Sequence, residues 1–598
     1  MKRRVVAVAG VFALVGVWSG CQGLVKGVSQ LTVNVAGAGT GTVTSTPPGI
    51  NCPGTCSANF TGNPQVTLTA QPAAGFGFGG WTGSGINSCG QQSNTCTVSI
   101  GGSDVTATFT ASLQSINHII FLAQENRSFD GYFGAMRQYW AQNGYPDQSF
   151  DGLAEFNPAT GAAPNTGPAP SNPTCDPVTS TPTVCHVNPA GGEGGPPQPV
   201  FHLQTMCLEN PSPSWNEAHA QWNASDPVAP TATLDGFIRA AANDARQLTT
   251  VINGVPTPTP FFDVAGIRAM GYYDGGDLNY YYFMASNFAT SDRWFAPTMS
   301  RTPPNREYLI GGTSHGYVYP IGSNPGDQQL IPTPPIYEIL DQQNPPISWK
   351  IYVNPVGTNC GTTNPSSSCL YQYTYVKNFS YGTTILNTPS LLQNIVPISQ
   401  FQTDLQNNTL PQVVQIEPAS NAGLDEHPSD TDVNPACCSV QAGANYVAGL
   451  INNLMSSSSW SSSIFVFTFD EWGGFFDHVS PQTAVSPDGI PPSDLFANDT
   501  CTGAVGPNCD FVFTGYRVPM IVISPYSKKN FVSHTVADNT AILKLIETRF
   551  NLAPLTSRDA AQLDMSTEFL DFTNATWKTP PSPPAQNQGG ACYLDHLP

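Results

Sequence analysis

The sequence predicts an α/β fold, built on a mainly parallel sheet that is flanked by helices and preceded by a small all-β module. Residues 464–469 form a short apolar run rich in β-formers, which is typical of a buried parallel strand. Further runs of this kind alternate with helical patterns from residue 116 onward, the order that an α/β sheet requires. Residues 31–111 differ, because Thr alternates there with apolar residues between Gly, Pro and Asn.

Length and charge narrow the class of protein. The chain has 598 residues, which is more than one ordinary hydrophobic core can accommodate, so two or three domains are predicted. Only 10% of the residues are charged, and the formal net charge is −20. No basic patch is visible, which argues against nucleic acid as a partner and against simple adsorption to anionic lipid. The 55 Gly and 55 Pro residues indicate a loop-rich extracellular protein.

The first 21 residues have the features of a secretory signal peptide. Lys2, Arg3 and Arg4 precede an apolar run over residues 5–18 that is too short to span a bilayer. Ser19-Gly20-Cys21 resembles a bacterial lipoprotein cleavage box, which would make Cys21 the lipidated residue and bring the protein to a membrane surface. Trp18 stands where that box usually has Leu, so plain secretion is the alternative.

The 15 cysteines fit an oxidising compartment, because an even number, 14, remains when Cys21 is set aside. Local disulfides are the default expectation, and zinc is disfavoured because His and Cys do not cluster with ligand spacing. The close pairs are Cys52/Cys56, Cys89/Cys96, Cys175/Cys185, Cys360/Cys369 and Cys501/Cys509, which leaves Cys207, Cys437, Cys438 and Cys592.

Residues 30–112 are expected to form the all-β module. Its Thr-rich strands, a Gly79-Gly-Trp-Thr-Gly83 motif and two Cys pairs resemble the divergent β-repeat modules of bacterial surface proteins. The resemblance implies either adhesion or substrate attachment, whereas the simpler reading is a stalk or spacer.

The remaining chain, residues 113–598, is expected to be one catalytic domain. Its first strand is predicted at residues 118–124 and ends in Glu125 and Asn126. The other predicted strands are residues 347–353, 413–416, 464–469 and 518–523, and the predicted helices are residues 215–222, 280–288, 446–455 and 540–550.

Acidic residues follow the central apolar run directly. Asp470 and Glu471 end it, then Gly473 and Gly474 allow a tight turn or a close approach to a ligand, before Asp477 and His478. The carboxyl ends of buried strands are where open α/β sheets bind ligands. Adjacent carboxylates repel each other unless a cation lies between them, so the pattern favours a metal site over a solvated turn.

Four stretches taken in order resemble a known family. They are Glu125-Asn-Arg-Ser-Phe-Asp130, Thr302-Pro-Pro-Asn-Arg306, Asp425-Glu-His-Pro428 and Asp470 to His478. With Arg517-Val-Pro and Ser524-Pro525, they resemble the bacterial phosphoesterase family that contains phosphatidylcholine-type phospholipases C and an acid phosphatase branch. The resemblance covers residues 116–559 and implies an alkaline-phosphatase-like catalytic domain.

The resemblance implies roles for these residues. Glu125, Asn126, Asp470 and Glu471 would bind one divalent cation; oxygen ligands suit Ca²⁺, Mg²⁺ or Mn²⁺, and a nearby His would also admit Zn²⁺. Thr302 would be the nucleophile that forms a phosphothreonine, although a Thr before two prolines also suits a helix N-cap.

The other site residues have both functional and structural alternatives. His427 would protonate the leaving alkoxide, with Glu426 or Asp425 orienting it. Asn305, Arg306 and Glu426 would help to bind the substrate, although Arg306 also suits a structural ion pair. His478 would contact phosphate or bond to a strand end.

The sequence therefore predicts an exported, metal-dependent phosphoesterase. The favoured reaction is phospholipase C cleavage of a phospholipid to diacylglycerol and a phosphorylated head group. The alternatives are a broad-specificity acid phosphatase acting on phosphate monoesters and a non-catalytic surface-binding protein. Motifs around phosphorus do not distinguish the two enzymes, because loops select the leaving group.

Overall fold

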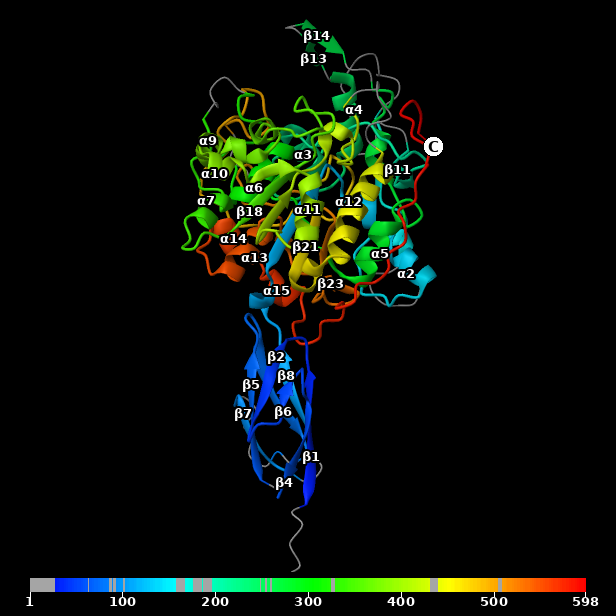
Figure 1. Ribbon diagram of the computed structural model, residues 1–598. Helices are drawn as coiled ribbons and strands as arrows, with labels where there is room; N and C mark the ends of the chain where they lie inside the picture. The colour runs from blue at the N-terminus through cyan, green and yellow to red at the C-terminus, as the bar shows by residue number, and fades with distance from the viewer. Residues whose placement is uncertain are drawn as a thin grey trace, which may run out of the picture. The chain divides into compact units, whose positions relative to one another are not determined.

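A computed structural model of the chain describes residues 27–597 except 63, 85, 87–88, 90–92, 101–102, 158–166, 176–184, 186–195, 248, 253–254, 259–260, 324–328, 431–438 and 504–507. The predicted signal segment, Cys21, Cys437 and Cys438 lie outside the described residues. The chain divides into two compact units, the first ending at Ala111 and the second beginning at Ser112 (Figure 1).

The first unit is an all-β sandwich, as predicted. Two four-stranded sheets have the strand orders β4-β1-β8-β6 and β3-β2-β5-β7, and every pair of strands is antiparallel except β1 with β8. Alternate apolar residues such as Leu31, Leu68 and Phe109 fill its core. The strands are β1 Val28–Ala36, β2 Gly41–Thr46, β3 Asn51–Cys52, β4 Ser57–Thr61, β5 Gln65–Pro72, β6 Gly77–Gly83, β7 Thr95–Ser99 and β8 Ser103–Thr110.

An eight-stranded sheet organises the second unit, with the order β19-β18-β20-β9-β21-β22-β16-β23. It is mainly parallel, because only β22 runs antiparallel to its neighbours. Every residue of β21 is buried, as its continuous apolar run predicts. The strands are β9 His118–Gln124, β16 Ala289–Ser291, β18 Trp349–Val353, β19 Ile395–Pro397, β20 Val413–Ile416, β21 Ser463–Phe469, β22 Met520–Ile523 and β23 Phe531–Ser533.

Helices flank this sheet, which confirms the predicted α/β class (Figure 1). The predicted helix at residues 215–222 matches α3, and the other three differ from the observed helices mainly at their ends. The α-helices of four residues or more are α1 Phe129–Phe133, α2 Met136–Asn143, α3 Trp215–Trp222, α4 Phe237–Gln247, α5 Asn279–Asn287, α6 Thr302–Gly311, α7 Ile336–Asp341, α8 Ser367–Tyr371, α9 Ser380–Asn387, α10 Pro389–Leu392, α11 Ser399–Asn407, α12 Val440–Met455, α13 Ala541–Phe550, α14 Ser557–Ala560 and α15 Met565–Glu568.

Short elements complete the second unit. Its small strands form the pairs β10 Ser171–Asn172 with β11 Gln198–Pro199, β12 Phe201–His202 with β15 Gly271–Tyr272, β13 Thr249–Ile252 with β14 Val255–Pro258, and β17 Trp294–Phe295 with β24 Ala537–Asp538. The 3₁₀ helices are η1 Leu113–Ser115, η2 Ala154–Phe156, η3 Ile267–Met270, η4 Tyr375–Asn378, η5 Ser420–Ala422 and η6 Ser458–Ser462.

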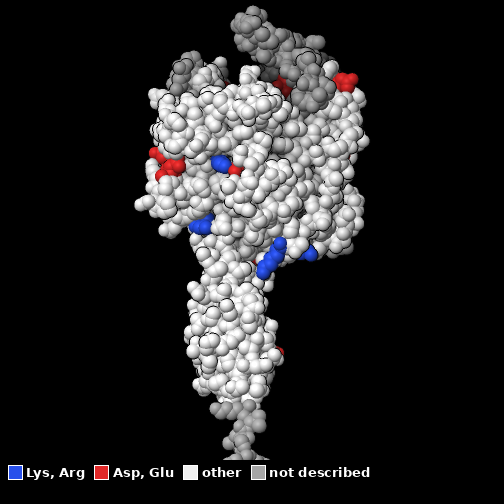
Figure 2. Space-filling model, viewed as in Figure 1, with Lys and Arg blue, Asp and Glu red and all other residues white. Residues whose placement is uncertain are grey.

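The described residues contain the five predicted local disulfides and one long-range bond, Cys207–Cys592. The long-range bond joins residues 385 positions apart, so spacing gave no indication of it. Disulfides in this number are typical of proteins that fold in an oxidising compartment. The face of the molecule in Figure 2 carries few charged side chains, in keeping with the low charged fraction of the chain. Among the described helices, none combines the length and the apolar character needed to cross a bilayer.

Candidate active site

The candidate site lies where β9 and β21 end. These neighbouring strands are parallel, and Gln124 is paired with Phe469 at the end of their ladder. Glu125 and Asp470, the next residue on each strand, therefore leave the sheet side by side. The backbone N–H of Asn126 donates to Asp470 Oδ1 at 3.2 Å. The structure thus brings together two acidic stretches that are 344 residues apart in the sequence.

Thr302 joins this group from α6. Its hydroxyl donates to Asn126 Oδ1 at 3.3 Å. Arg301 is the N-cap residue and Thr302 is the first helical residue, so the capping interpretation of Thr302 is wrong. Asn126 has a left-handed backbone with φ of 61°, a conformation that non-glycine residues rarely adopt and that is enriched at functional sites.

Arg306, one turn further along α6, is the buried cation of the site. Its Nε lies 3.2 Å from Asp470 Oδ2 and its Nη2 lies 3.2 Å from Glu125 Oε1. Burial works against the charged guanidinium, but these two carboxylates raise the pKa of Arg306 above its usual value. The ion-pair alternative for Arg306 is therefore what the structure shows, and the pair links α6 to both strand ends.

The single positive charge of Arg306 does not balance the nearby carboxylates of Glu125, Asp470 and Glu471. Burial, followed by the charge of Asp470, raises the pKa of both Glu125 and Glu471 well above the usual value. Glu471 Oε2 accepts from the backbone N–H of Gly473 at 2.6 Å, whereas the buried Oε1 has no hydrogen-bond partner among the described residues. A buried carboxylate oxygen without a donor is free to accept a bond from a cation or a ligand.

Gly473 is required by the packing of this turn. Its φ is 72°, and a Cβ atom there would lie 2.3 Å from the carbonyl oxygen of Asn126. The glycine therefore lets the turn after β21 lie directly against the turn after β9.

Asn305 and Glu426 do not match their predicted substrate-binding roles. Asn305 is fully buried; its Oδ1 accepts from the backbone of Thr298 and its Nδ2 donates to the carbonyl of Ser300 at 2.6 Å. Its side chain therefore secures the loop before α6. Glu426 is also fully buried, and neighbouring side chains donate to both of its carboxylate oxygens.

The Glu426 carboxylate is bound by phenols. Tyr132 and Tyr281 donate to its two oxygens at 2.6 and 2.5 Å, and Gln124 donates at 3.2 Å. Burial raises the pKa of Glu426 to about 7. The hypothesis that this carboxylate orients His427 is therefore wrong, since its oxygens face the tyrosines.

The loop that carries His427 is held against the candidate site. The backbone N–H of Glu125 donates to the carbonyl of Asp425 at 2.9 Å, and Arg127 donates twice to the carbonyl of Glu426. The His427 backbone N–H donates to Asp425 Oδ1 at 3.3 Å, and its Nδ1 lies 2.5 Å from the carbonyl of Pro428. An Nδ1–H bonded to that carbonyl leaves Nε2 to exchange a proton with a substrate.

His478 belongs to a neighbouring charged network. Its Nδ1 lies 2.6 Å from Asp130 Oδ2 and its Nε2 lies 3.2 Å from Asp151 Oδ1. Burial alone would lower the pKa of His478, but Asp130 and Asp151 raise it to about 10. Both ring nitrogens are engaged by protein carboxylates, which supports the structural alternative for this residue.

The buried Arg517 holds the same network together, bonding Asp477 at 2.8 Å and Asp130 at 3.0 Å. We expect Arg517→Met to lower the free energy of unfolding by about 3–5 kcal/mol, because it leaves buried carboxylates unpaired. Urea titration followed by tryptophan fluorescence would measure the change. Arg293→Met is the matched control: its pair with Asp151, whose side chains are 28% and 25% exposed, should be worth about 0–1 kcal/mol. The buried Asp292, which Arg293 also approaches, keeps His534 as a partner. Equal losses of unfolding free energy in the two variants would contradict the role of Arg517 as the counter-ion of the buried carboxylates.

Two described groups have ligand atoms close enough to hold a metal ion. They are Asp130 with Asp477 and His478, and His202 with Asp274 and Asp277. The first group already has Arg517 as a counter-ion. The second is half-buried, and His202 Nε2 is bonded to Asp277 at 2.7 Å.

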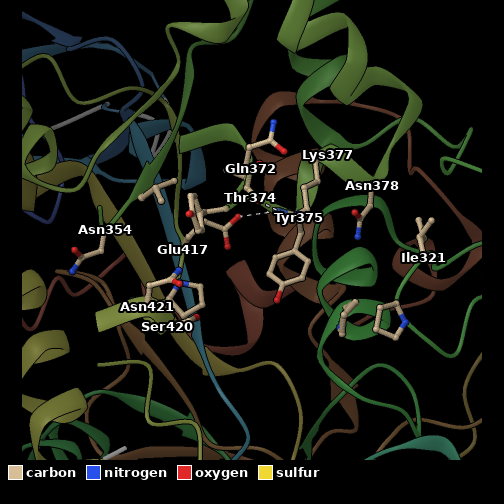
Figure 3. A pocket seen from close by; sticks show the side chains of 15 residues that line it. Ile321, Asn354, Gln372, Thr374, Tyr375, Lys377, Asn378, Glu417, Ser420 and Asn421 are labelled. Carbon is tan, nitrogen blue, oxygen red and sulfur yellow. Dashed lines mark hydrogen bonds between the residues drawn. The ribbon is translucent and has the colours of Figure 1, made fainter. Parts of the chain in front are cut away.

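A pocket of about 430 Å³ lies beside the candidate site (Figure 3). Pro303, the residue after Thr302, lines it, and so does Tyr375, whose ring centroid lies 5.6 Å from the Arg306 guanidinium. Glu417, the first residue after β20, also lines it. Glu417 is not among the predicted site residues, although, like Glu125 and Asp470, it is an acid that directly follows a buried strand.

The mainly parallel α/β sheet gathers a hydroxyl, an arginine and several buried carboxylates at its strand ends, which are groups that a hydrolase of phosphoric esters can use. The chain belongs to the Phosphoesterase family, whose sequence model matches residues 116–553. Residues 31–113 match the divergent InlB B-repeat domain. The chain is thus a phosphoric ester hydrolase that carries the kind of β-repeat module its sequence resembles.

Curated relatives are phospholipases C. "Phospholipase C B" of Mycobacterium tuberculosis is 29% identical over 514 residues, which cover 81% of each chain. "Non-specific phospholipase C4" of Arabidopsis thaliana is 26% identical and covers 70% of this chain and 63% of its own. Among solved structures, a protein in the alkaline phosphatase superfamily from Vibrio parahaemolyticus aligns with a TM-score of 0.27 and 12% identity, over 48% of this chain and 66% of that one.

Proposed function

We propose that this protein is an exported, metal-dependent phospholipase C that cleaves a phospholipid to diacylglycerol and a phosphorylated head group. The contact of the Thr302 hydroxyl with Asn126, beside the buried acids, is the observation that carries the proposal. The names of the relatives above support the lipid substrate.

The residue types at the strand ends suit a divalent cation, although in this structure their oxygens are not gathered as closely as those of the two groups described above. Glu125, Asp470 and Glu471 are buried carboxylates, Asn126 adds an amide oxygen, and Glu471 Oε1 has no described hydrogen-bond partner. Arg306 compensates only part of the charge. An all-oxygen donor set suits Mg²⁺, Mn²⁺ or Ca²⁺. Bound there, the cation would supply Lewis acidity to a hydroxyl and to phosphate oxygens.

The chain's own residues would then carry two displacement steps. Thr302 Oγ1 would lose its proton to solvent and attack phosphorus, and the bond from phosphorus to the diacylglycerol oxygen would break. His427, presented by the loop against Glu125, would give that oxygen its proton. The intermediate would be a phosphothreonine that still carries the head group as its second ester. Water that gives its proton to the same histidine would then break the bond from phosphorus to Thr302, which takes a proton from solvent, and the phosphorylated head group would be released.

One assay separates the lipase from the broad phosphatase. Phosphatidylcholine and an aryl monophosphate would each be offered to the full chain, with and without a chelator. We expect diacylglycerol release, and loss of turnover of both substrates on chelation. Turnover of the aryl ester alone would favour the acid phosphatase alternative. Activity that survives chelation would contradict the proposed metal dependence.

Export and lipidation at Cys21 are part of the proposal. The disulfides favour an oxidising compartment, and a lipid on Cys21 would hold the enzyme next to its substrate. Intact-mass analysis of the protein from its native membrane fraction would detect acylation of Cys21.

The β-module is predicted to be dispensable for the chemistry, because all proposed site residues lie beyond residue 116 and the module forms a separate compact unit. Deletion of residues 22–112 should leave turnover of a soluble aryl ester within a few fold. The control is the thermal unfolding midpoint of the remaining unit. A folded but inactive protein would show that the module takes part in catalysis.

A further inference from the structure

Glu417 is a buried carboxylate that faces the pocket beside Thr302. It follows β20, whose neighbour in the sheet is β9, so it leaves the same sheet edge as Glu125. Its side chain is 1% exposed. Oε1 accepts from Gln415 Nε2 at 3.0 Å and from the backbone of Tyr375 at 3.3 Å, whereas the buried Oε2 has no hydrogen-bond partner among the described residues.

A ligand in this pocket would have to satisfy that oxygen. Figure 3 shows Glu417 beside Tyr375, to whose backbone a dashed line joins it, with Lys377 and Asn378 further to the right. A buried acceptor left without a donor weakens binding, so the occupant needs an N–H or O–H group here. Burial raises the pKa of Glu417 to about 7, and a cationic ligand would favour its ionised form.

The rest of the lining also favours hydrogen bonding. Asn354, Thr374, Ser420 and Asn421 also line the pocket. Lys377 is the other charged residue of the lining; its ammonium donates to the carbonyl of Gln372 at 2.5 Å, and its side chain extends to solvent. Glu417 is therefore the buried carboxylate of the lining, and the charges of Arg306 and Lys377 act on it.

A trimethylammonium group does not fit this environment well. It has no N–H to donate, and proteins bind such groups against the open faces of several aromatic rings. Only Tyr373 and Tyr375 of the lining are aromatic, and the ring of Tyr375 already has the Arg306 guanidinium over it.

We infer that this pocket binds the head group of the substrate. It selects a protonated primary amine over a trimethylammonium group, and Glu417 is the residue that binds the amine. The inference rests on the proposed attack of Thr302 on phosphorus. Pro303, the residue after Thr302, lines the pocket, so the pocket lies next to the place where the phosphorus atom would be attacked. Phosphatidylethanolamine, in preference to phosphatidylcholine, is thus the substrate class.

The test compares two short-chain lipids that differ only in the head group, ethanolamine or choline, with the full-length enzyme. We expect kcat/KM to favour the ethanolamine lipid by at least about tenfold, the factor that corresponds to about 1.4 kcal/mol. Glu417→Gln should bring the ratio close to one, and Glu417→Asp should keep part of it. The ratio is informative because a loss of folding would lower both rates alike.

Glu338→Gln, on the outer helix α7, is the matched control and should keep the wild-type ratio. Inhibition of aryl phosphate hydrolysis by phosphoethanolamine and by phosphocholine tests the pocket without a lipid. If neither lipid is cleaved but phosphoethanolamine inhibits tenfold better through Glu417, the lipase proposal fails and the pocket assignment stands. Equal rates and equal inhibition, or a preference for choline, would overturn the inference.

Discussion

Thr302→Val should reduce kcat by several orders of magnitude while leaving the protein folded. Valine keeps the branched shape of threonine at the start of α6 but removes the hydroxyl that contacts Asn126. Without that oxygen no phosphothreonine can form. A loss of about 10³-fold corresponds to about 4 kcal/mol of transition-state stabilisation. Steady-state hydrolysis of a soluble aryl phosphate would measure it.

Two controls separate the chemistry from the fold. Thr302→Ser keeps an oxygen at the same position and should retain substantial activity. Rapid quenching of the wild-type enzyme followed by mass spectrometry should locate phosphate on the peptide that carries Thr302. Near-normal turnover by a folded Thr302→Val protein would overturn the mechanism, because another group would then have to attack phosphorus.

Most of the central strands, and the acidic residues at the ends of two of them, could be predicted from the sequence. Residues 464–467 and 119–123 are apolar throughout because both faces of these strands are covered, and such runs can be recognised without a structure. Acids that directly follow them had to meet at one edge of a parallel sheet. The same reasoning, applied to the predicted strand at 413–416, would have identified Glu417.

The direction of individual side chains could not be read in this way. Glu426 was assigned to His427 because the two are adjacent, yet its φ of 70° and the phenols of Tyr132 and Tyr281 turn the carboxylate into the core. The tyrosines come from distant parts of the chain, so no local pattern indicates them. Cys207–Cys592 is a similar case, because only the fold brings its ends together.

Asp470→Asn should lose bound metal and activity together. Asp470 Oδ1 accepts from the backbone of Asn126 and of Glu471, and Oδ2 is paired with Arg306. The substitution replaces one anionic ligand by a neutral amide of the same size, which weakens binding of a hard cation. It also leaves Arg306 with Glu125 as its remaining partner. Metal content per protein, measured by mass spectrometry of the purified enzyme, is the readout, alongside kcat.

Asp274→Asn is the matched control, because it removes one carboxylate from the other, half-buried group of potential ligands. The control should keep both metal and turnover if the cation belongs to the strand ends. Loss of metal from the control, with retention in Asp470→Asn, would place the ion at His202 instead. If Asp470→Asn kept a normal metal content but had no activity, Asp470 would not be a metal ligand. Its charge would then be needed for the reaction in another way, either as a base or as the ion-pair partner that positions Arg306.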